Sequence, residues 1–370
     1  MGNNDSNCNR HLFLFNPLKE GADLDMYYPP YPPNPVPPYG VSYYPPRQAD
    51  PLKEYRRGLR KTVNRLSWMI VAGIFLMSLL YALLPQILWA IGYPMLDPNF
   101  DGLSQEMYFL ISCLYYVVGM FFPFFFFQLA SHKSFNKAVP FEPFPFRLFF
   151  PCLFIGTAVC LLANYPANMV AVLIEQFGYN ALPPETALPD SPVGIALYVV
   201  GIAVIPPLVE EFAFRGIILS RLRKYGDGFA VIASALLFGI YHGNLVQLPF
   251  AFLCGLIFGF LVLRTRNLLL PILIHAVNNG ISVTLELLQG CYGEAFANTV
   301  YGILFIAILI LAIVSTVFLA IKEKGFFRPA SAHHPVRLST RFGALFANPG
   351  IIVLLLYFVY TSVVLMNLYA

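Results

Sequence analysis

Long apolar runs, separated by short polar segments, dominate the chain from residue 66 onward. A helix needs about 20 predominantly apolar residues to cross the hydrocarbon core of a bilayer, and these runs are of that order. They predict about nine transmembrane helices, near residues 66–92, 107–130, 148–176, 194–222, 228–246, 248–265, 268–288, 298–321 and 349–369. The third contains Asn164-Tyr165-Pro166 and is expected as either a continuous or a broken helix. The pattern therefore predicts an all-α polytopic membrane protein with a core helical bundle.

The polar segments divide the chain into four parts. Residues 1–62 are expected to form a disordered cytoplasmic tail, because its Pro/Tyr-rich stretch "MYYPPYPPNPVPPYGVSYYPP" favours extended polyproline II over a packed core. Residues 63–321 form the predicted membrane domain, residues 322–346 a basic cytoplasmic loop, and residues 347–370 a C-terminal transmembrane helix. The tail does not indicate what it binds.

Composition supports a membrane location. Hydrophobic residues make up 58% of the 370 residues, charged residues only 11%, and the mean hydropathy is +0.66. A soluble domain carries about 25% charged residues, so a soluble globular protein is excluded. The expected partners are the lipid bilayer and a peptide or membrane-anchored protein, not nucleic acid.

Lysine and arginine are confined to alternate segments between the predicted helices. The segments without any basic residue include 93–106, 179–193 and 289–297, whereas 53–65, 131–147, 221–224, 264–266 and 322–341 all carry them. Basic loops stay on the cytoplasmic side of a membrane. With nine spans, this segregation predicts a multi-pass protein of the cell membrane with its N-terminus in the cytoplasm and its C-terminus outside.

Ionisable and amide side chains gather in three of the predicted spans. The fourth contains "LVEEFAFRG" with Glu210, Glu211 and Arg215. The fifth ends with His242 and Asn244, and the seventh carries "HAVNNG", with His275, Asn278 and Asn279. Such residues cost a few kcal/mol each at membrane depth, so they are expected to face one another or a water-filled cavity.

Helical spacing separates the roles of the two glutamates. Glu211 and Arg215 are four residues apart and can pair on one helix face. Glu210 is rotated by about 100° from Glu211 and is left to point elsewhere, toward His242 as we expect. Both lie roughly 20–24 Å from the turn near residue 225, at 1.5 Å per residue. A carboxylate without a cation of its own, close to a histidine, suits a general base.

Three motifs carry a resemblance to a known family. "EEFAFR" at 210–215, "FGIYH" at 238–242 and "HAVNN" at 275–279 match EExxxR, FxxxH and HxxxN in order. The chain thereby resembles the CPBP family of intramembrane endopeptidases, which includes the type II CAAX prenyl protease and lysostaphin resistance protein A. The resemblance covers about residues 190–290.

The resemblance implies a role for each motif residue. Glu210 would activate water together with His242, while His275 and Asn279 would stabilise the oxyanion. Glu211 and Arg215 would support the site. A zinc ion held by Glu210, His242 and His275 is the competing idea, but no HExxH helix is present, so we expect a protease without a cofactor.

Non-enzymatic functions remain as alternatives. Intramembrane ionisable residues also mark ion pathways, so a transporter is one, although no inverted repeat is visible. An immunity or binding protein on the same scaffold is another. The histidines and the Glu/Arg pair could also be plain interhelical contacts, but such contacts usually use Ser, Thr or Asn. The substrate stays open among a prenylated C-terminal tripeptide, a peptide leader or bacteriocin-related peptide, and a transmembrane segment.

The segregation of lysine and arginine generates a prediction about topology. Cys291 lies in a segment without basic residues and Cys8 in the N-terminal tail. A membrane-impermeant maleimide should therefore label Cys291 on intact cells and label Cys8 only after permeabilisation. Cys291→Ala, which should abolish the outside signal, is the control. Labelling of Cys8 but not Cys291 on intact cells would invert the topology.

Overall fold

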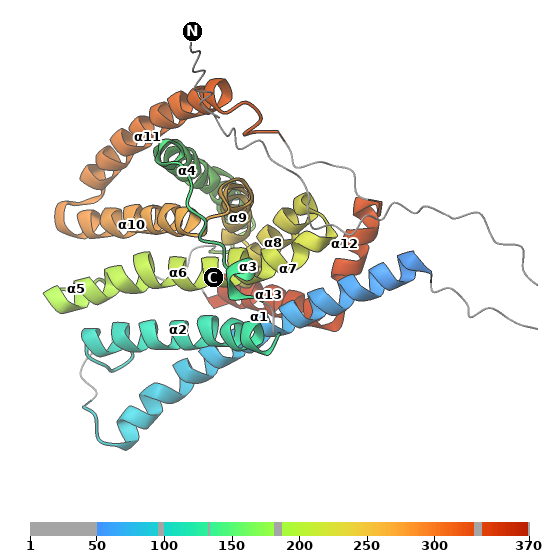
Figure 1. The fold of residues 1–370 in the computed structure, drawn as a ribbon. Helices are drawn as coiled ribbons and strands as arrows, with labels where there is room; N and C mark the ends of the chain where they lie inside the picture. Colours follow the sequence, from blue (N-terminus) through green and yellow to red (C-terminus); the bar gives the residue numbers. More distant parts are fainter. Residues whose placement is uncertain (1–49, 95–99, 132–133, 181–186, 329–334, 369–370) are drawn as a thin grey trace, which may run out of the picture. The chain divides into compact units, whose positions relative to one another are not determined.

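A computed structural model of the protein describes residues 50–94, 100–131, 134–180, 187–328 and 335–368, and this part of the chain is helical without any named β-strand. Figure 1 shows the helices. Their bounds are α1 Pro51–Ala90, α2 Gln105–Ala130, α3 Phe135–Ala138, α4 Phe146–Gln176, α5 Pro192–Val199, η2 Val200–Val204, α6 Ile205–Glu211, η3 Phe212–Ile218, α7 Leu219–Leu222, η4 Arg223–Tyr225, α8 Asp227–Tyr241, α9 Gln247–Thr265, α10 Leu269–Tyr292, α11 Glu294–Lys322, α12 Leu338–Phe346 and α13 Pro349–Leu368.

The described residues contain eight helical stretches that are long and apolar enough to cross a membrane. They confirm an all-α polytopic membrane protein. The segment 192–225 counts as one of them, although it consists of several helical pieces in succession. α4 is one continuous helix with Pro151 and Pro166 inside it, so the break considered at Asn164-Tyr165-Pro166 does not occur.

The predicted fifth span, residues 228–246, is shorter than expected. Its helix α8 has 15 residues and ends at Tyr241, below the length of the other eight. The cause is Gly243, whose φ of +63° turns the chain in a conformation that other residues rarely adopt. Residues 242–246 therefore form a turn, and the chain returns along α8 as α9. The expected nine spans correspond to eight long helices and this shorter one.

Two predicted segment boundaries need correction. Residues 51–62, expected to be disordered, form the first turns of α1. Asp50 caps this helix by accepting a hydrogen bond from Leu52 N at 2.9 Å, and Pro51 occupies the first turn, where its missing N–H is harmless. Leu59, in the same segment, is fully buried. The remainder of the predicted tail, including Cys8, lies outside the described residues.

The predicted basic loop 322–346 also contains a helix, α12. Its Arg341 is buried and donates through Nη1 to the Tyr225 carbonyl at 2.9 Å, so α12 rests on the turn before α8. Figure 1 shows α12 and α13 beside α1 and α8.

The segment 192–225 is interrupted twice by π-helical turns, η2 and η3, which flank the seven-residue helix α6. Pro206 and Pro207 begin α6 and cannot donate backbone hydrogen bonds to the preceding turn. π-Helical turns are rare and often occur at functional sites. Figure 1 shows this segment between α2 and α10, with both of which it is in contact.

Candidate active site

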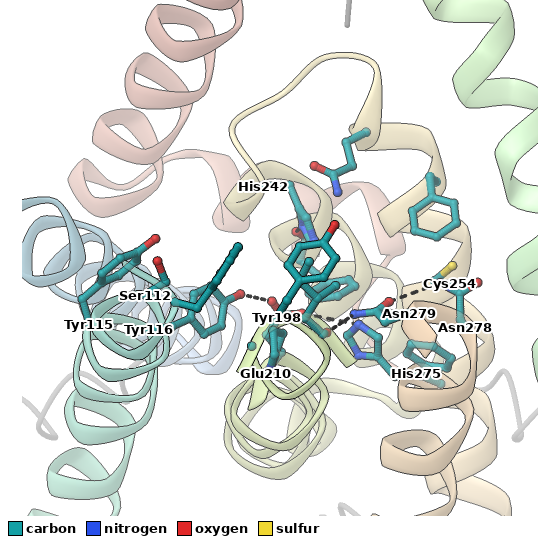
Figure 2. A pocket seen from close by; sticks show the side chains of 18 of the residues that line it. Ser112, Tyr115, Tyr116, Tyr198, Glu210, His242, Cys254, His275, Asn278 and Asn279 are labelled. Atoms are coloured by element: carbon teal, nitrogen blue, oxygen red, sulfur yellow. Dashed lines mark hydrogen bonds and ion pairs between the residues drawn. The ribbon is translucent and has the colours of Figure 1, made fainter. Parts of the chain in front are cut away.

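The three motifs come together around one cavity of about 370 Å³ (Figure 2). Glu210 reaches it from α6, His242 from the end of α8, and His275 and Asn279 from α10. All four predicted catalytic residues therefore line a single space. Glu211 and Arg215 are not part of its lining. The other polar side chains around it are Tyr108, Ser112, Tyr115, Tyr116, Tyr198, Gln247, Cys254 and Asn278.

Glu210 is 3% exposed and uses its two carboxylate oxygens differently. Oε1 accepts a hydrogen bond from the hydroxyl of Tyr116 on α2. Oε2 has no hydrogen-bond partner and lies 3.8 Å from Nε2 of His275. Figure 2 shows Tyr116 and His275 on opposite sides of Glu210. A buried carboxylate oxygen without a donor is free to accept a proton from a bound water.

Glu211 and Arg215 form the expected pair one helical turn apart. Arg215 Nη1 lies 2.8 Å from Glu211 Oε1, and the two side chains are 1% and 0% exposed. The guanidinium also faces aromatic rings, with its Cζ 4.2 Å from the Phe238 centroid and 5.1 Å from that of Phe258. Such cation–π contacts strengthen where water is absent.

Gly255 lets α9 approach this buried cation. A Cβ at Gly255 would lie 2.8 Å from the Cα and Cβ atoms of Ala235 and 3.2 Å from Nη2 of Arg215. Any larger residue would push α9 away from α8. The close approach brings the neighbouring Phe258 of α9 onto the guanidinium.

His275 joins the two glutamates. Its Nδ1 lies 3.1 Å from Oε1 of Glu211, and its Nε2 faces Glu210. A carboxylate can only accept, so Nδ1 donates to Glu211. Phe258 stacks on the imidazole at a centroid distance of 5.5 Å, which fixes the plane of the ring.

His242 is oriented by the backbone of its own helix. Its Nδ1 lies 2.7 Å from the carbonyl oxygen of Phe238. That carbonyl can only accept, so Nδ1 carries the hydrogen and Nε2 is left as an acceptor. No hydrogen bond joins His242 to Glu210 among the described residues. The two instead border the same cavity.

Asn279 replaces a hydrogen-bond donor that the backbone lacks. In an α-helix the Ile202 carbonyl would bond the N–H of residue 206, and in a π-helix that of residue 207. Both are prolines, so neither donor exists. Asn279 Nδ2 donates to the Ile202 carbonyl at 2.9 Å, and its Oδ1 accepts from Asn278 Nδ2 at 3.2 Å. The amide orientation is thus fixed, with a second N–H hydrogen still available.

Tyr116 is the functional side chain that the sequence motifs missed. It belongs to "LYYVVG" on α2, nearly a hundred residues before the first motif, and no spacing links it to Glu210. Its hydroxyl accepts in turn from Tyr241 at 3.3 Å. The sequence offered one indication, a hydroxyl-bearing side chain within an apolar span. Tyr108, Tyr115 and other residues share this feature, so it does not single out Tyr116.

A zinc ion in a protein is usually held by three or four side chains placed together. Among the described residues, no three His, Cys, Asp or Glu side chains are placed so that they could hold one metal ion. Glu210, His242 and His275, the ligands of the zinc alternative, do not form such a group.

The buried pair generates a prediction about stability. Arg215→Ala should destabilise the protein by about 3–5 kcal/mol, because it leaves Glu211 charged, buried and without its cation. Thermal unfolding in detergent measures this. The control is Arg223→Ala, which breaks an exposed pair of the same spacing (side chains 45% and 30% exposed) and should cost at most about 1 kcal/mol. Equal effects of the two variants would contradict a structural role for Arg215.

Comparisons with known proteins match this same region. Residues 192–281 match the family model described as "Type II CAAX prenyl endopeptidase Rce1-like". The membrane-embedded CAAX protease MroQ of Staphylococcus aureus (strain USA300) is 28% identical over 153 residues, or 39% of this chain and 61% of MroQ. The putative membrane peptidase YdiL of Bacillus subtilis (strain 168) is 33% identical over 94 residues, or 25% of this chain and 38% of YdiL.

The chain thus spans less than two thirds of the length of either relative. No solved structure matches it significantly. The matched segment 192–281 nevertheless holds all three motifs and every candidate catalytic residue that they supply. Through this segment, the chain is similar to the Rce1-like CAAX endopeptidases.

Proposed function

We propose that the protein is an intramembrane endopeptidase that hydrolyses a peptide bond with water activated by Glu210. One observation carries this proposal. Glu210 presents an unpartnered oxygen at a cavity that His242, His275 and Asn279 also line, while Tyr116 holds its other oxygen. The names of both relatives, MroQ and YdiL, describe a protease or a peptidase, which supports the same class of reaction.

The proposed reaction needs no covalent enzyme intermediate. Glu210 Oε2 removes a proton from water while the water oxygen forms a bond to the carbonyl carbon of the substrate. His242 Nε2, left as an acceptor by the Phe238 contact, orients the same water through its second hydrogen. The carbonyl oxygen becomes an oxyanion. The C–N bond then breaks as Glu210 returns the proton to the leaving amine.

Two side chains are placed to stabilise the oxyanion. Asn279 has one N–H hydrogen beyond the one bound to Ile202. His275 donates from Nδ1 to Glu211, and its Nε2 faces the Glu210 side of the cavity, so a hydrogen on Nε2 would point toward the oxyanion. Fixed donors of this kind are most effective where water is scarce.

The lining of the cavity bears on the substrate. No lysine or arginine is among the described residues that border it, and Glu210 is its only carboxylate. A free C-terminal carboxylate held inside this cavity would lack a cationic partner, whereas neutral peptide groups find hydroxyl and amide side chains. We therefore favour an internal peptide bond of a peptide or membrane-anchored protein over a bond directly beside a free C-terminus. Whether the substrate carries a prenyl group is left to experiment.

Glu210→Gln is the sharpest test of the mechanism. The amide keeps the shape of the carboxylate but cannot take the proton, and general base catalysis is typically worth about 10²–10⁴-fold. Comparative proteomics of membranes that contain the wild type or Glu210→Gln should show an uncleaved precursor only with the variant. His242→Ala should accumulate the same precursor.

The alternatives give different results in this experiment. Identical precursor levels with and without Glu210→Gln would refute the peptidase and favour a transporter, immunity or binding protein. A purified protein could instead lose its activity on exhaustive chelation and regain it when zinc is added. That result would show that a zinc ion, and not Glu210 alone, activates the water. We expect chelation to have no effect.

Tyr116→Phe tests the hydrogen bond to Glu210. Hydrogen bonds to charged groups contribute about 1.5–3 kcal/mol, so losing this one should lower kcat by about ten- to hundredfold, and the free energy of unfolding should fall by no more than a similar amount. Tyr301→Phe on α11, whose side chain does not line the cavity, is the control and should be neutral. Full activity of Tyr116→Phe would show that Glu210 is oriented without it.

A further inference from the structure

We propose that the C-terminal helix α13, which lies outside the family match at 192–281, is a positioning element of the active site. Its Thr361 and Ser362 hold the turn that carries His242. The inference rests on the proposed function, in which His242 orients the water.

The contact is made to a single backbone carbonyl. Thr361 Oγ1 lies 2.7 Å from the carbonyl oxygen of Gly243, and Ser362 Oγ lies 3.5 Å from the same atom. Thr361 also has two carbonyls of its own helix within reach, Tyr357 at 2.9 Å and Phe358 at 3.1 Å. Those belong to a continuous helix and have backbone partners of their own. Gly243 lies in a turn, and the hydroxyls of α13 are the donors that the described residues offer it.

A carbonyl without a donor is costly inside a membrane protein. The Thr361 hydroxyl therefore stabilises the protein more by donating to the Gly243 carbonyl than by donating to a carbonyl of its own helix, which already has a backbone donor. The packing is close as well. A Cβ at Gly243 would lie 2.9 Å from Thr361 Oγ1 and 3.4 Å from a ring carbon of Tyr357. With its φ of +63°, this turn fits against α13 only with glycine.

The His242 ring is thus held from two directions. Phe238 fixes Nδ1 from the α8 side, and α13 fixes the Gly243 carbonyl, in the second peptide unit after His242. If the turn at Gly243 shifts without this anchor, His242 at the end of α8 shifts with it, and Nε2 moves relative to Glu210. Misplacements of about 1 Å can cost 10²-fold in rate.

α13 is itself anchored at its other end. Asn348 caps its start by accepting from Ile351 N at 3.0 Å, and Gly350 N donates to Asn64 Oδ1 of α1 at 2.9 Å. A Cβ at Gly350 would lie 2.9 Å from the Cβ of Ser67, so α13 meets α1 closely there. The anchor fixes the height of Thr361 along the bundle. α1, α13 and the His242 turn form one continuous chain of contacts.

The test removes the hydroxyls and keeps the side-chain volume. Thr361→Val combined with Ser362→Ala should lower kcat by about 10- to 100-fold while KM stays near wild type. The unfolding temperature should fall, because the Gly243 carbonyl loses its donors. Thr361→Ser, with Ser362 intact, should restore most of the rate because it keeps a donor. Thr316→Val on α11 is the matched control, since its hydroxyl bonds only the Ala312 carbonyl of its own helix, and it should be neutral. The probe is a quenched fluorescent peptide, selected from a mixed-sequence library because the wild type cleaves it and Glu210→Gln does not.

A second measurement does not depend on catalysis. Histidine-selective ¹⁵N NMR, with the His242 signal assigned through His242→Gln, reports which ring nitrogen carries the hydrogen. The wild type should show the single Nδ1–H form that the Phe238 contact selects, and the double variant a mixture of forms. Unchanged NMR and unchanged kcat would overturn the role of α13 while leaving the peptidase intact. A library in which the wild type cleaves no peptide that Glu210→Gln leaves intact would refute the proposed function instead, and the NMR arm would still decide whether α13 positions His242.

Discussion

The ion pair between Glu211 and Arg215 is the interaction on which the site depends. Both side chains are almost completely buried, and neither could remain charged at that depth alone. Arg215 is further enclosed by Phe238 and Phe258, one from the FxxxH segment and one from α9. Because Glu211 takes the cation and the Nδ1 hydrogen of His275, the adjacent Glu210 keeps an oxygen without a partner. Two neighbouring glutamates thus have different surroundings: Glu211 is paired with a cation, and Glu210 borders the cavity with one oxygen that has no hydrogen-bond partner.

A second constraint is that the backbone near the site must satisfy its own hydrogen bonds. Pro206 and Pro207 leave the Ile202 carbonyl without a helical donor, and Asn279 supplies one from α10. In the η3 turn, Ser234 of α8 donates to the Phe214 carbonyl at 3.0 Å. These side chains supply hydrogen bonds to backbone carbonyls on both sides of α6. The irregular segment is therefore held by its neighbours and not by its own helix alone.

Periodicity and spacing were sufficient for the membrane helices and for the pairing of Glu211 with Arg215, because both follow from local geometry along one helix. They were insufficient at Gly243 and at Asp50. One glycine ends α8 early, and one cap starts α1 twelve residues before the predicted membrane domain. The motifs brought Glu210, His242, His275 and Asn279 to one cavity, but they could not reveal Tyr116 or Thr361. Those residues contact the site because helices that are far apart in the chain pack together. The spacing of residues within one helix does not indicate which other helices pack against it.

The hydrogen bond between Thr361 and Gly243 also has a consequence for the order in which the site forms during biosynthesis. A ribosome delivers helices from the N-terminus onward, at about 5–20 residues per second. The turn bearing His242 is made before α9, α10, α11 and α12, and its partner on α13 is made after all of them. For several seconds the growing chain holds all three motifs in the bilayer without the hydroxyls that fix the His242 turn. The His242 turn therefore gains its contact with α13 only after the other membrane helices have been made.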